Sequence, residues 1–151
     1  MDAVTVRRAG PADADAIAAL TREAYAKWVP LIGREPLPMT ADYAQAVRDH
    51  RFDLLFAGQD LAALIETAPQ GDDLLIVNVA VHPTFQKRGF GVRLMRLAET
   101  LAAEAGLAGL RLYTNQRFAE NIALYRSLGY AVEREEESAL GVTVYMTRPL
   151  A

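Results

Sequence analysis

The sequence predicts a mixed α/β (α+β) fold with one mostly antiparallel central sheet of about seven strands, about four helices and one parallel β-α-β crossover. Three observations lead to this prediction. Short apolar segments with strand-like patterning run along the whole chain, amphipathic segments with helical spacing lie between some of them, and a strand–helix–strand succession occupies residues 74–114. No internal repeat, low-complexity tract or linker divides the sequence, so residues 1–151 are expected to form a single domain.

The first third of the chain is predicted to form one short strand and two helices. Apolar residues alternate with polar ones over residues 4–6, as in a strand with one buried face. A helix is expected after Gly10-Pro11, because apolar residues then recur at helical spacing: Ile17, Leu20, Ala24 and Trp28. Residues 29–39 contain three prolines and a glycine and are expected to be irregular. Thr40 is expected to cap a second helix that reaches about residue 47.

The middle of the chain supplies a predicted hairpin and the parallel crossover. Residues 52–56 and 61–65 are apolar strands joined by a four-residue turn. Residues 74–81 are almost continuously apolar and rich in β-branched residues, as expected of a strand buried on both faces. A helix follows Gly91, and a strand at 110–114 completes a right-handed parallel unit. The apolar stripe of this helix consists of Leu94, Leu97, Ala98, Leu101, Ala102 and Ala105.

The C-terminal part is predicted to contain a helix and a final hairpin. The helix spans about residues 119–128 and ends at Gly129, a residue type that caps helices in the left-handed conformation. Two strands, 130–135 and 142–148, are expected to pair around residues 138–141. Their exposed edge makes a homodimer a possible assembly, although the acid-rich residues 133–137 are more simply explained as a solvated hairpin.

Composition narrows the class of protein. Hydrophobic residues make up 52% of the chain and charged residues 23%, which is typical of a folded globular protein. The net charge of −3 gives no reason to expect a nucleic-acid partner. The absence of cysteine excludes disulfides, thiolate metal sites and cysteine nucleophiles. The N-terminus lacks an apolar stretch of signal-peptide length and no apolar run is long enough to cross a bilayer, so a cytoplasmic protein without a membrane partner is expected.

The segment that carries chemistry is Gln86-Lys87-Arg88-Gly89-Phe90-Gly91, between the buried strand and the amphipathic helix. Its two glycines allow close approach of the backbone to a ligand, and the first amides of the helix lack intrahelical acceptors. Residues 82–96 contain four cations and no carboxylate. Together these features predict a site for a polyphosphate. The alternative is a tight connection without a ligand; the segment is neither a P-loop nor a dinucleotide-binding fingerprint.

Two motifs give the sequence a family resemblance. Val81-x-Pro83-x-x-Gln86-x-x-Gly89-x-Gly91 resembles the acetyl-CoA signature of the GNAT superfamily of N-acetyltransferases. The segment from Asn121 to Gly129-Tyr130, with Leu124-Tyr125 inside it, resembles the second cofactor segment of that superfamily. The order of predicted elements fits the superfamily over essentially the whole chain.

The resemblance implies an acetyl-CoA-dependent acyltransferase that needs no metal. A primary amine would attack the thioester directly, and a backbone N–H near Val79 would stabilise the developing negative charge. The pantetheine arm would pair with the strand, which is expected to splay from its parallel neighbour after Val79. Lys87 or Arg88 would reach the outer phosphates. The residues implied in cofactor binding are Val79, Ala80, Val81, Gln86, Lys87, Arg88, Gly89, Phe90, Gly91 and Asn121.

Tyr125 is the residue that the resemblance implies as the acid that protonates the departing thiolate. The alternative for Tyr125 is plain core packing, and Asn121 is either a cofactor ligand or a helix cap. Many relatives carry a glutamate as the base where this chain has Val77. Glu66, Asp42 or a chain of waters would then have to accept the proton of the amine. His82 is expected to be a turn residue, and no chemistry is assigned to His50.

The acceptor is expected to bind among the first two helices, their connection and the buried strand. The candidate binding residues are Tyr25, Trp28, Tyr43 and Asn78, and Arg34 with Glu35 can recognise a zwitterion. The alternative for Trp28 and Tyr43 is helix–sheet packing. A small amine or amino acid is the favoured acceptor. The competing hypotheses are a protein N-terminal or lysine acetyltransferase, a non-catalytic acyl-CoA-binding module and a structural domain.

Overall fold

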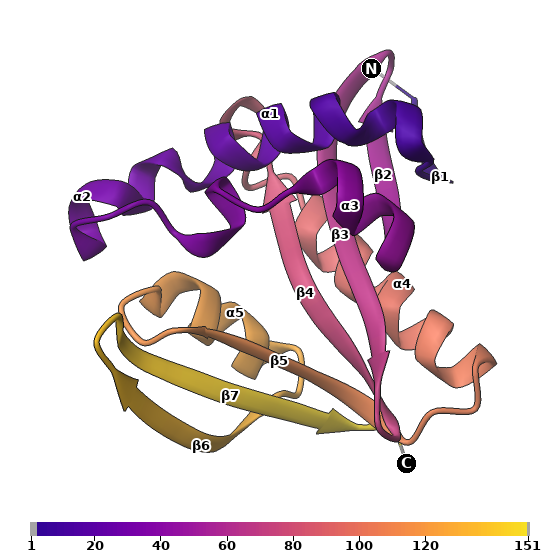
Figure 1. The fold of residues 1–151 in the computed structure, drawn as a ribbon. Coiled ribbons are helices and arrows are strands. Elements are labelled where there is room, and N and C mark those ends of the chain that lie inside the picture. The colour runs from indigo at the N-terminus through magenta and orange to yellow at the C-terminus, as the bar shows by residue number, and fades with distance from the viewer. Residues whose placement is uncertain (1–2, 151) are drawn as a thin grey trace.

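The computed structural model describes residues 3–150, and its centre is one seven-stranded sheet (Figure 1). The strand order is β1-β2-β3-β4-β5-β7-β6, and every neighbouring pair is antiparallel except β4 and β5, which are parallel. This arrangement confirms the predicted fold class. The strands are β1 Val4–Arg8, β2 Arg51–Ala57, β3 Asp60–Gln70, β4 Asp73–Val81, β5 Gly109–Asn115, β6 Ala131–Ser138 and β7 Gly141–Pro149.

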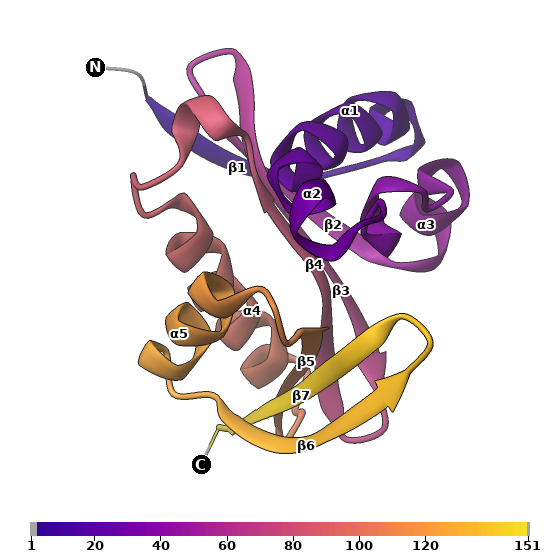
Figure 2. The same ribbon diagram turned by 90° about the vertical axis from the view of Figure 1, so that its left-hand side faces the viewer.

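Helices cover both faces of the sheet (Figure 2). They are α1 Ala14–Tyr25, α2 Val29–Ile32, α3 Tyr43–Asp49, α4 Phe90–Glu104 and α5 Ala119–Ser127. The first three lie on one side and α4 and α5 on the other. Two cores result, because successive strand residues point to opposite faces: Leu64 packs in the cluster with α1 and α3, and Ile65 in the cluster with α4. No helix among residues 3–150 combines the length and apolarity needed to span a membrane.

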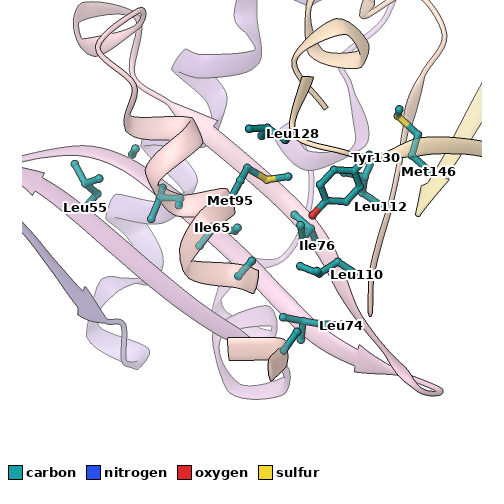
Figure 3. Close-up of a cluster of buried hydrophobic side chains, with 14 of the residues drawn as sticks. Leu55, Ile65, Leu74, Ile76, Met95, Leu110, Leu112, Leu128, Tyr130 and Met146 are labelled. Atoms are coloured by element: carbon teal, nitrogen blue, oxygen red, sulfur yellow. The ribbon is translucent and has the colours of Figure 1, made fainter. Parts of the chain in front are cut away.

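The larger core lies between the sheet and the helices α4 and α5 (Figure 3). Leu94 and Ala98 of the predicted stripe are fully buried in it. Two details of the stripe were predicted wrongly: Met95 is also buried, whereas Ala105 lies beyond the end of α4 and is exposed. Met95 fills space between α4 and the sheet because it lies next to Leu94 on the helix face that rests on the strands.

The strand β4 is interrupted by a bulge at Val77. Glu66 of β3 pairs with Asn78, but the next residue of β3, Thr67, pairs with Ile76, so Val77 is an extra residue on β4. On its other side β4 pairs with β5 only from Asp73 to Ile76. The prediction that the strands separate after Val79 is therefore wrong by three residues. Residues 77–81 consequently have no strand partner on the β5 side.

The connection between α1 and α3 is more regular than its prolines predict. Residues 29–39 include the short helix α2, which ends at Gly33 with a φ of 75°, and a 3-10 turn at Leu37–Met39. Thr40 does not cap the second helix, because its hydroxyl donates to the Leu37 carbonyl of the preceding turn. The cap is Asp42, whose Oδ1 accepts from the Gln45 amide at 3.2 Å.

Two hairpins extend further than predicted. β3 continues to Gln70, because β4 pairs with it along its whole length, and this pairing brings Glu66 into the middle of the sheet. The last hairpin closes with Ser138 paired to Gly141. β6 is exposed along its whole length and forms one edge of the sheet, as expected for the solvated hairpin. Its run of charged side chains is the kind of sequence that discourages edge-to-edge pairing.

Candidate functional site

The smaller of two neighbouring cavities, of about 230 Å³, lies where β4 has lost its partner β5. It is bounded by the end of α1, the end of β4, the loop 86–91 and α5. The lining residues are Ala24, Tyr25, Lys27, Trp28, Val79, Ala80, Val81, Gln86, Lys87, Gly91, Met95, Glu120, Asn121, Leu124 and Tyr125. Most of the expected cofactor residues are therefore brought together around one space. Arg88 and Gly89 in the loop and Phe90 at the start of α4 do not line it.

The loop before α4 adopts a conformation suited to binding an anion. Lys87 has a φ of 64° and Gly89 a φ of 80°, so the chain turns through the left-handed region twice before α4 begins. No side chain caps α4, and its first amides have no intrahelical acceptor. The Gln86 Nε2 donates to the Val81 carbonyl at 3.2 Å, which fixes the loop to the end of β4. Backbone amides at a helix N-terminus attract phosphate groups.

Cations surround the smaller cavity. Lys87 lines it and is exposed, while the Arg88 guanidinium lies 5.2 Å from the centroid of the Phe85 ring. Lys27 also lines it, with its Nζ 4.7 Å from the centroid of the Trp28 ring. The free edge of β4, the amides of the loop and these cations fit an extended ligand that carries phosphates at one end. The donor set therefore matches coenzyme A in chemistry.

A larger cavity, of about 440 Å³, lies beside the smaller one. Four residues line both spaces: Tyr25, Val79, Asn121 and Tyr125. The lining also includes Asn78 and Tyr43, both expected to contact the acceptor, and Arg34, His50 and Glu66. Most of the remaining wall is apolar, so this space suits a ligand with an apolar body and one or two polar groups.

Three polar side chains are hydrogen bonded to one another in the larger cavity. The Tyr25 hydroxyl donates to Asn78 Oδ1 at 2.7 Å, Asn78 Nδ2 donates to the Tyr43 hydroxyl at 3.5 Å, and Tyr43 donates to the Pro38 carbonyl at 2.6 Å. Burial raises the pKa of Tyr43 to about 12 and that of Tyr25 well above its ordinary value. Both phenols are therefore neutral near pH 7, and the network accepts no net proton there.

Tyr125 lies at the junction of the two cavities. Burial raises the pKa of its phenol to about 12, and no described residue forms a hydrogen bond with its hydroxyl. The Tyr125 ring packs against the larger core, and the same side chain lines both cavities. Asn121 lies four residues earlier on the same face of α5 and also lines both cavities. The helix-cap alternative for Asn121 is wrong, because the N-cap of α5 is Phe118 and no side chain caps that end.

Trp28 lies on the wall of the smaller cavity and does not line the larger one, contrary to its expected role in acceptor binding. The cause is local: after Tyr25 the chain tightens into a 3-10 turn at Ala26–Trp28, which changes the direction of the side chain from the helical period. The Trp28 ring stacks on Phe118 with ring centroids 4.6 Å apart. Phe118 lines the larger cavity, and sequence reasoning missed it.

Glu66 and His50 form a buried pair on the wall of the larger cavity. His50 Nδ1 lies 2.7 Å from Glu66 Oε2, and the Glu66 side chain is only 5% exposed. Burial raises the pKa of Glu66, and the hydrogen bond with His50 opposes this shift. Of the proton acceptors considered from sequence, Glu66 lines the cavity, whereas Asp42 does not line it and caps α3.

The sequence analysis assigned no chemical role to His50. The pairing of β2 with β3 explains why His50 lies beside Glu66. Phe52 pairs with Glu66 across β2 and β3, so the residue just before β2 is close to Glu66. His82, the other histidine, is a turn residue as expected: its Nδ1 accepts from the Thr84 amide at 3.1 Å.

Arg34 and Glu35 are separated by the fold. Arg34 lines the larger cavity, whereas Glu35 pairs with Arg22 at 3.1 Å and does not line the cavity. The rim carries large apolar side chains that are exposed, Leu37 at 64%, Tyr113 at 47% and Leu140 at 51%. These rim residues were not expected from the sequence. Exposed apolar side chains gathered at one opening are typical of a ligand-binding surface.

Comparison with known proteins agrees with this geometry. Residues 16–130 match the model of the acetyltransferase (GNAT) family. The uncharacterised N-acetyltransferase YvbK of Bacillus subtilis (strain 168) is 32% identical over 81 residues, which are 52% of this chain and 51% of that protein. The chain thus matches about half the length of this curated relative.

Solved structures share the fold. The PaiA N-acetyltransferase of Thermoplasma acidophilum, determined in complex with coenzyme A, superposes with a TM-score of 0.83 at 18% identity, covering 97% of this chain and 99% of that one. The ribosomal-protein-S18-alanine N-acetyltransferase of Escherichia coli has a TM-score of 0.81 at 22% identity, and the match covers 99% of this chain and 95% of that one. The fold, the match over residues 16–130 and the arrangement of the two motifs lead to one conclusion: this chain belongs to the GNAT acetyltransferase family.

Proposed function

We propose that this protein transfers the acetyl group of acetyl-CoA to the primary amine of a small acceptor, an amine or amino acid, by direct attack. One observation carries the proposal: the two cavities share Tyr25, Val79, Asn121 and Tyr125, so a thioester in one and an amine in the other can meet there. Holding two reactants in contact removes much of the entropic cost of a bimolecular reaction.

The smaller cavity is the proposed binding site of acetyl-CoA. The pantetheine arm pairs with the free edge of residues 79–81, the pyrophosphate lies on the amides of residues 86–91, and Lys87 or Arg88 reaches the outer phosphates. Asn121 is proposed to form a hydrogen bond with the arm. A backbone N–H near Val79 faces the thioester carbonyl and stabilises its negative charge as the amine attacks. One such donor contributes roughly 3 kcal/mol in other acyl-transfer enzymes.

Tyr125 is the proposed acid. Its hydroxyl donates a hydrogen bond to the thioester sulfur and passes its proton to the sulfur as the C–S bond breaks. Because an ordinary thiol has a pKa of about 8.5 and the pKa of Tyr125 is about 12, this transfer is uphill. It is completed when the amine nitrogen, made acidic by the new C–N bond, returns a proton to the phenolate.

The acceptor is proposed to be an amine with an apolar body. The ammonium end lies near Tyr25 and Asn78, and the body contacts the apolar wall and rim. Arg34 lines this space and has no carboxylate of residues 3–150 within 4.0 Å, so it can receive the carboxylate of an amino acid. A cavity of about 440 Å³ suits a small molecule.

The first test measures donor and acceptor separately. Acetyl-CoA at ten to a hundred times its Kd is expected to raise the melting temperature, because a ligand of the native state adds roughly 1–3 kcal/mol of stability. Thiol release is then followed with benzylamine, phenylalanine, leucine, spermidine and a short peptide with a free N-terminus. Turnover of the apolar small amines is expected to exceed that of the peptide; the reverse order would favour a protein acceptor. Binding without turnover of any amine would contradict the proposed transferase.

Tyr125→Phe tests the acid. The variant is expected to lower kcat by at least about 100-fold, while the Kd for acetyl-CoA changes less than threefold. Tyr145→Phe is the matched control, because this phenol lies on β7 and donates to Glu136 away from both cavities. Unchanged kcat in Tyr125→Phe would remove the phenol from the mechanism.

A further inference from the structure

Two carboxylates are buried among the described residues, Asp53 and Glu66, and they have different partners. Asp53 accepts two hydrogen bonds from the Arg51 guanidinium, at 3.0 and 3.1 Å. Arginine remains charged at all working pH values, so Asp53 has a permanent counter-charge and no way to pass on a proton. Glu66 has only His50, an imidazole whose ring nitrogens can each donate or accept a hydrogen. Glu66 alone of the two also lines a cavity.

The bulge at Val77 places Glu66 beside the reaction centre. Glu66 pairs directly with Asn78, and residues paired across a sheet point to the same face. Asn78 in turn accepts from Tyr25, one of the four residues that line both cavities. The carboxylate is therefore one strand away from the place where amine and thioester meet, on the face that carries the larger cavity.

The other groups of the larger cavity cannot accept the proton of an amine. Three of its four tyrosines, Tyr25, Tyr43 and Tyr125, are neutral at neutral pH, because burial raises their pKa values. The fourth, Tyr113, lies on the exposed rim. Asn78 has no basic form and the Arg34 guanidinium is already protonated. Val77, at the bulge, is apolar. Glu66 and His50 are the carboxylate and the imidazole among its described lining residues.

We propose that Glu66, backed by His50, takes the proton from the ammonium of the acceptor and so replaces a base on β4. This inference rests on the proposed acetyl transfer. Because the acceptor enters as a cation, the site selects amines that are protonated in water, and Glu66 holds them by charge before they react.

The protons balance in three steps. The ammonium R–NH₃⁺ transfers one proton to the Glu66 carboxylate and becomes the nucleophile R–NH₂. Glu66 passes this proton to His50 Nδ1 in the tautomer that carries its hydrogen on Nε2, and the exposed side of the ring releases the Nε2 proton to water. Exchange of the ring hydrogen with water then restores the starting tautomer. The second proton of the amine leaves after the C–N bond has formed and reaches the thiolate through Tyr125. The sum is one amide, one thiol and one proton released to solvent.

Burial gives the carboxylate a suitable basicity. It raises the pKa of Glu66 above the ordinary 4.5, and the hydrogen bond and charge of His50 partly offset this. The titratable groups around Glu66 are His50 from the end of α3, Tyr25 from α1 and Tyr43 from α3. A base with a higher pKa takes a proton from an ammonium group at a smaller cost in free energy.

The test is the pH dependence of kcat/KM for Glu66→Gln, measured with the fastest primary amine of the panel. For the wild type, kcat/KM is expected to stay constant at pH values between the pKa of Glu66 and the pKa of the amine. The variant can use only the neutral amine, so its kcat/KM is expected to rise about tenfold per pH unit up to the amine pKa. At pH 7 the expected loss is roughly 100- to 1,000-fold for an amine of ordinary basicity. Glu23→Gln is the matched control, since Glu23 is an exposed carboxylate that pairs with the other histidine, His82.

A second acceptor separates proton removal from damage to the fold. O-benzylhydroxylamine carries an amino group that is uncharged at neutral pH, so Glu66→Gln is expected to turn it over within about threefold of the wild-type rate. His50→Gln keeps a hydrogen-bond partner for Glu66 but cannot carry a proton onward. Its expected effect is a fall of about tenfold in kcat with KM little changed. The melting temperature and acetyl-CoA affinity of each variant check that the fold is intact.

The outcomes distinguish the two proposals. If the wild type binds acetyl-CoA but acetylates no amine, the transferase function fails and this inference fails with it. If the wild type turns over and the kcat/KM of Glu66→Gln stays constant over the same pH range, only the role of Glu66 is overturned. An equal loss with O-benzylhydroxylamine and with the basic amine would also overturn it, because the carboxylate would then act through structure alone.

Discussion

Gly89 and Gly91, two residues apart, impose different requirements on the backbone. Gly89 has a φ of 80°, a conformation that is unfavourable for residues with a Cβ. Gly91 lies in the first turn of α4, and a Cβ built there meets Val81 Cγ2 at 3.6 Å, an ordinary contact. Gly91 also lines the smaller cavity. The fold therefore requires Gly89, whereas the fold alone leaves room for a Cβ at Gly91, where the proposed ligand would approach the backbone.

Gly91→Ala is expected to separate binding from stability. The free energy of unfolding should stay the same or rise by up to about 1 kcal/mol, because alanine favours helix over glycine. Acetyl-CoA affinity should fall at least tenfold if the backbone must approach the phosphates. Gly89→Ala should instead lose about 1–2 kcal/mol of stability. Urea unfolding and calorimetric titration measure the two effects; wild-type affinity in Gly91→Ala would place the phosphates away from this turn.

Single residues of the site were predictable where motifs contain them. Tyr125, Asn121 and residues 86–91 belong to two segments that resemble the cofactor motifs of the GNAT superfamily, and the resemblance implied their roles. His50 was not predictable in this way, because its distance from Glu66 depends on the register of β2 with β3, and that register shifts at a bulge between Leu55 and Phe56. A bulge follows from local twist and packing, which sequence periodicity does not record.

At the scale of elements, the entry into α1 is held by a charged pair. Asp13 precedes α1, accepts from both terminal nitrogens of Arg7 at 2.8 and 3.0 Å, and accepts from the Gly10 amide at 2.9 Å. The hydrogen bonds from Arg7 are the largest cause that lowers the pKa of Asp13 from 3.8 to about 2, followed by that from Gly10. This arrangement joins β1 to the start of α1.

Asp13→Asn is expected to destabilise the fold by about 1 kcal/mol at neutral pH, the range of an exposed ion pair with a cap. Because the folded-state pKa is lowered, the stabilisation is complete above pH 3.8 and disappears as the pH falls through about 2. The difference in the free energy of unfolding between wild type and variant should therefore become smaller as the pH falls from 3.8 to about 2. Urea unfolding at pH 7, 4 and 2.5 measures it; a constant difference would mean that Arg7 contributes nothing through the charge of Asp13.

The presence of the helices and strands was easier to predict than the residues at which their pairing ends. The stripe on α4 and the apolar run of β4 defined both elements, because burial of one face leaves a periodic pattern. The separation of β4 from β5 at Ile76 was misplaced by three residues, since the bulge at Val77 changes the course of the strand without any change in the apolar pattern. The position of the open edge therefore had to come from the structure.

At the scale of the whole molecule, the walls of the larger cavity are joined by contacts between distant parts of the chain. The Arg117 Nη1 donates to the Leu31 carbonyl at 2.9 Å and the Arg34 Nη2 donates to the Leu140 carbonyl at 3.1 Å. The partners are 86 and 106 positions apart. The segment after α1 thus rests on the β5–α5 connection and on the turn between β6 and β7. Contacts of such long range leave no trace in local sequence, which explains why the rim was missed.

The stack of Trp28 on Phe118 gives the molecule an intrinsic optical reporter. The chain has one tryptophan, so its ultraviolet emission comes from a single indole that borders the smaller cavity and touches a wall residue of the larger one. Titration with coenzyme A should change the intensity or wavelength of this emission with a saturable curve, and an amine added afterwards should change it again. Emission that stays constant while calorimetry records binding would mean that the bound coenzyme lies away from the indole.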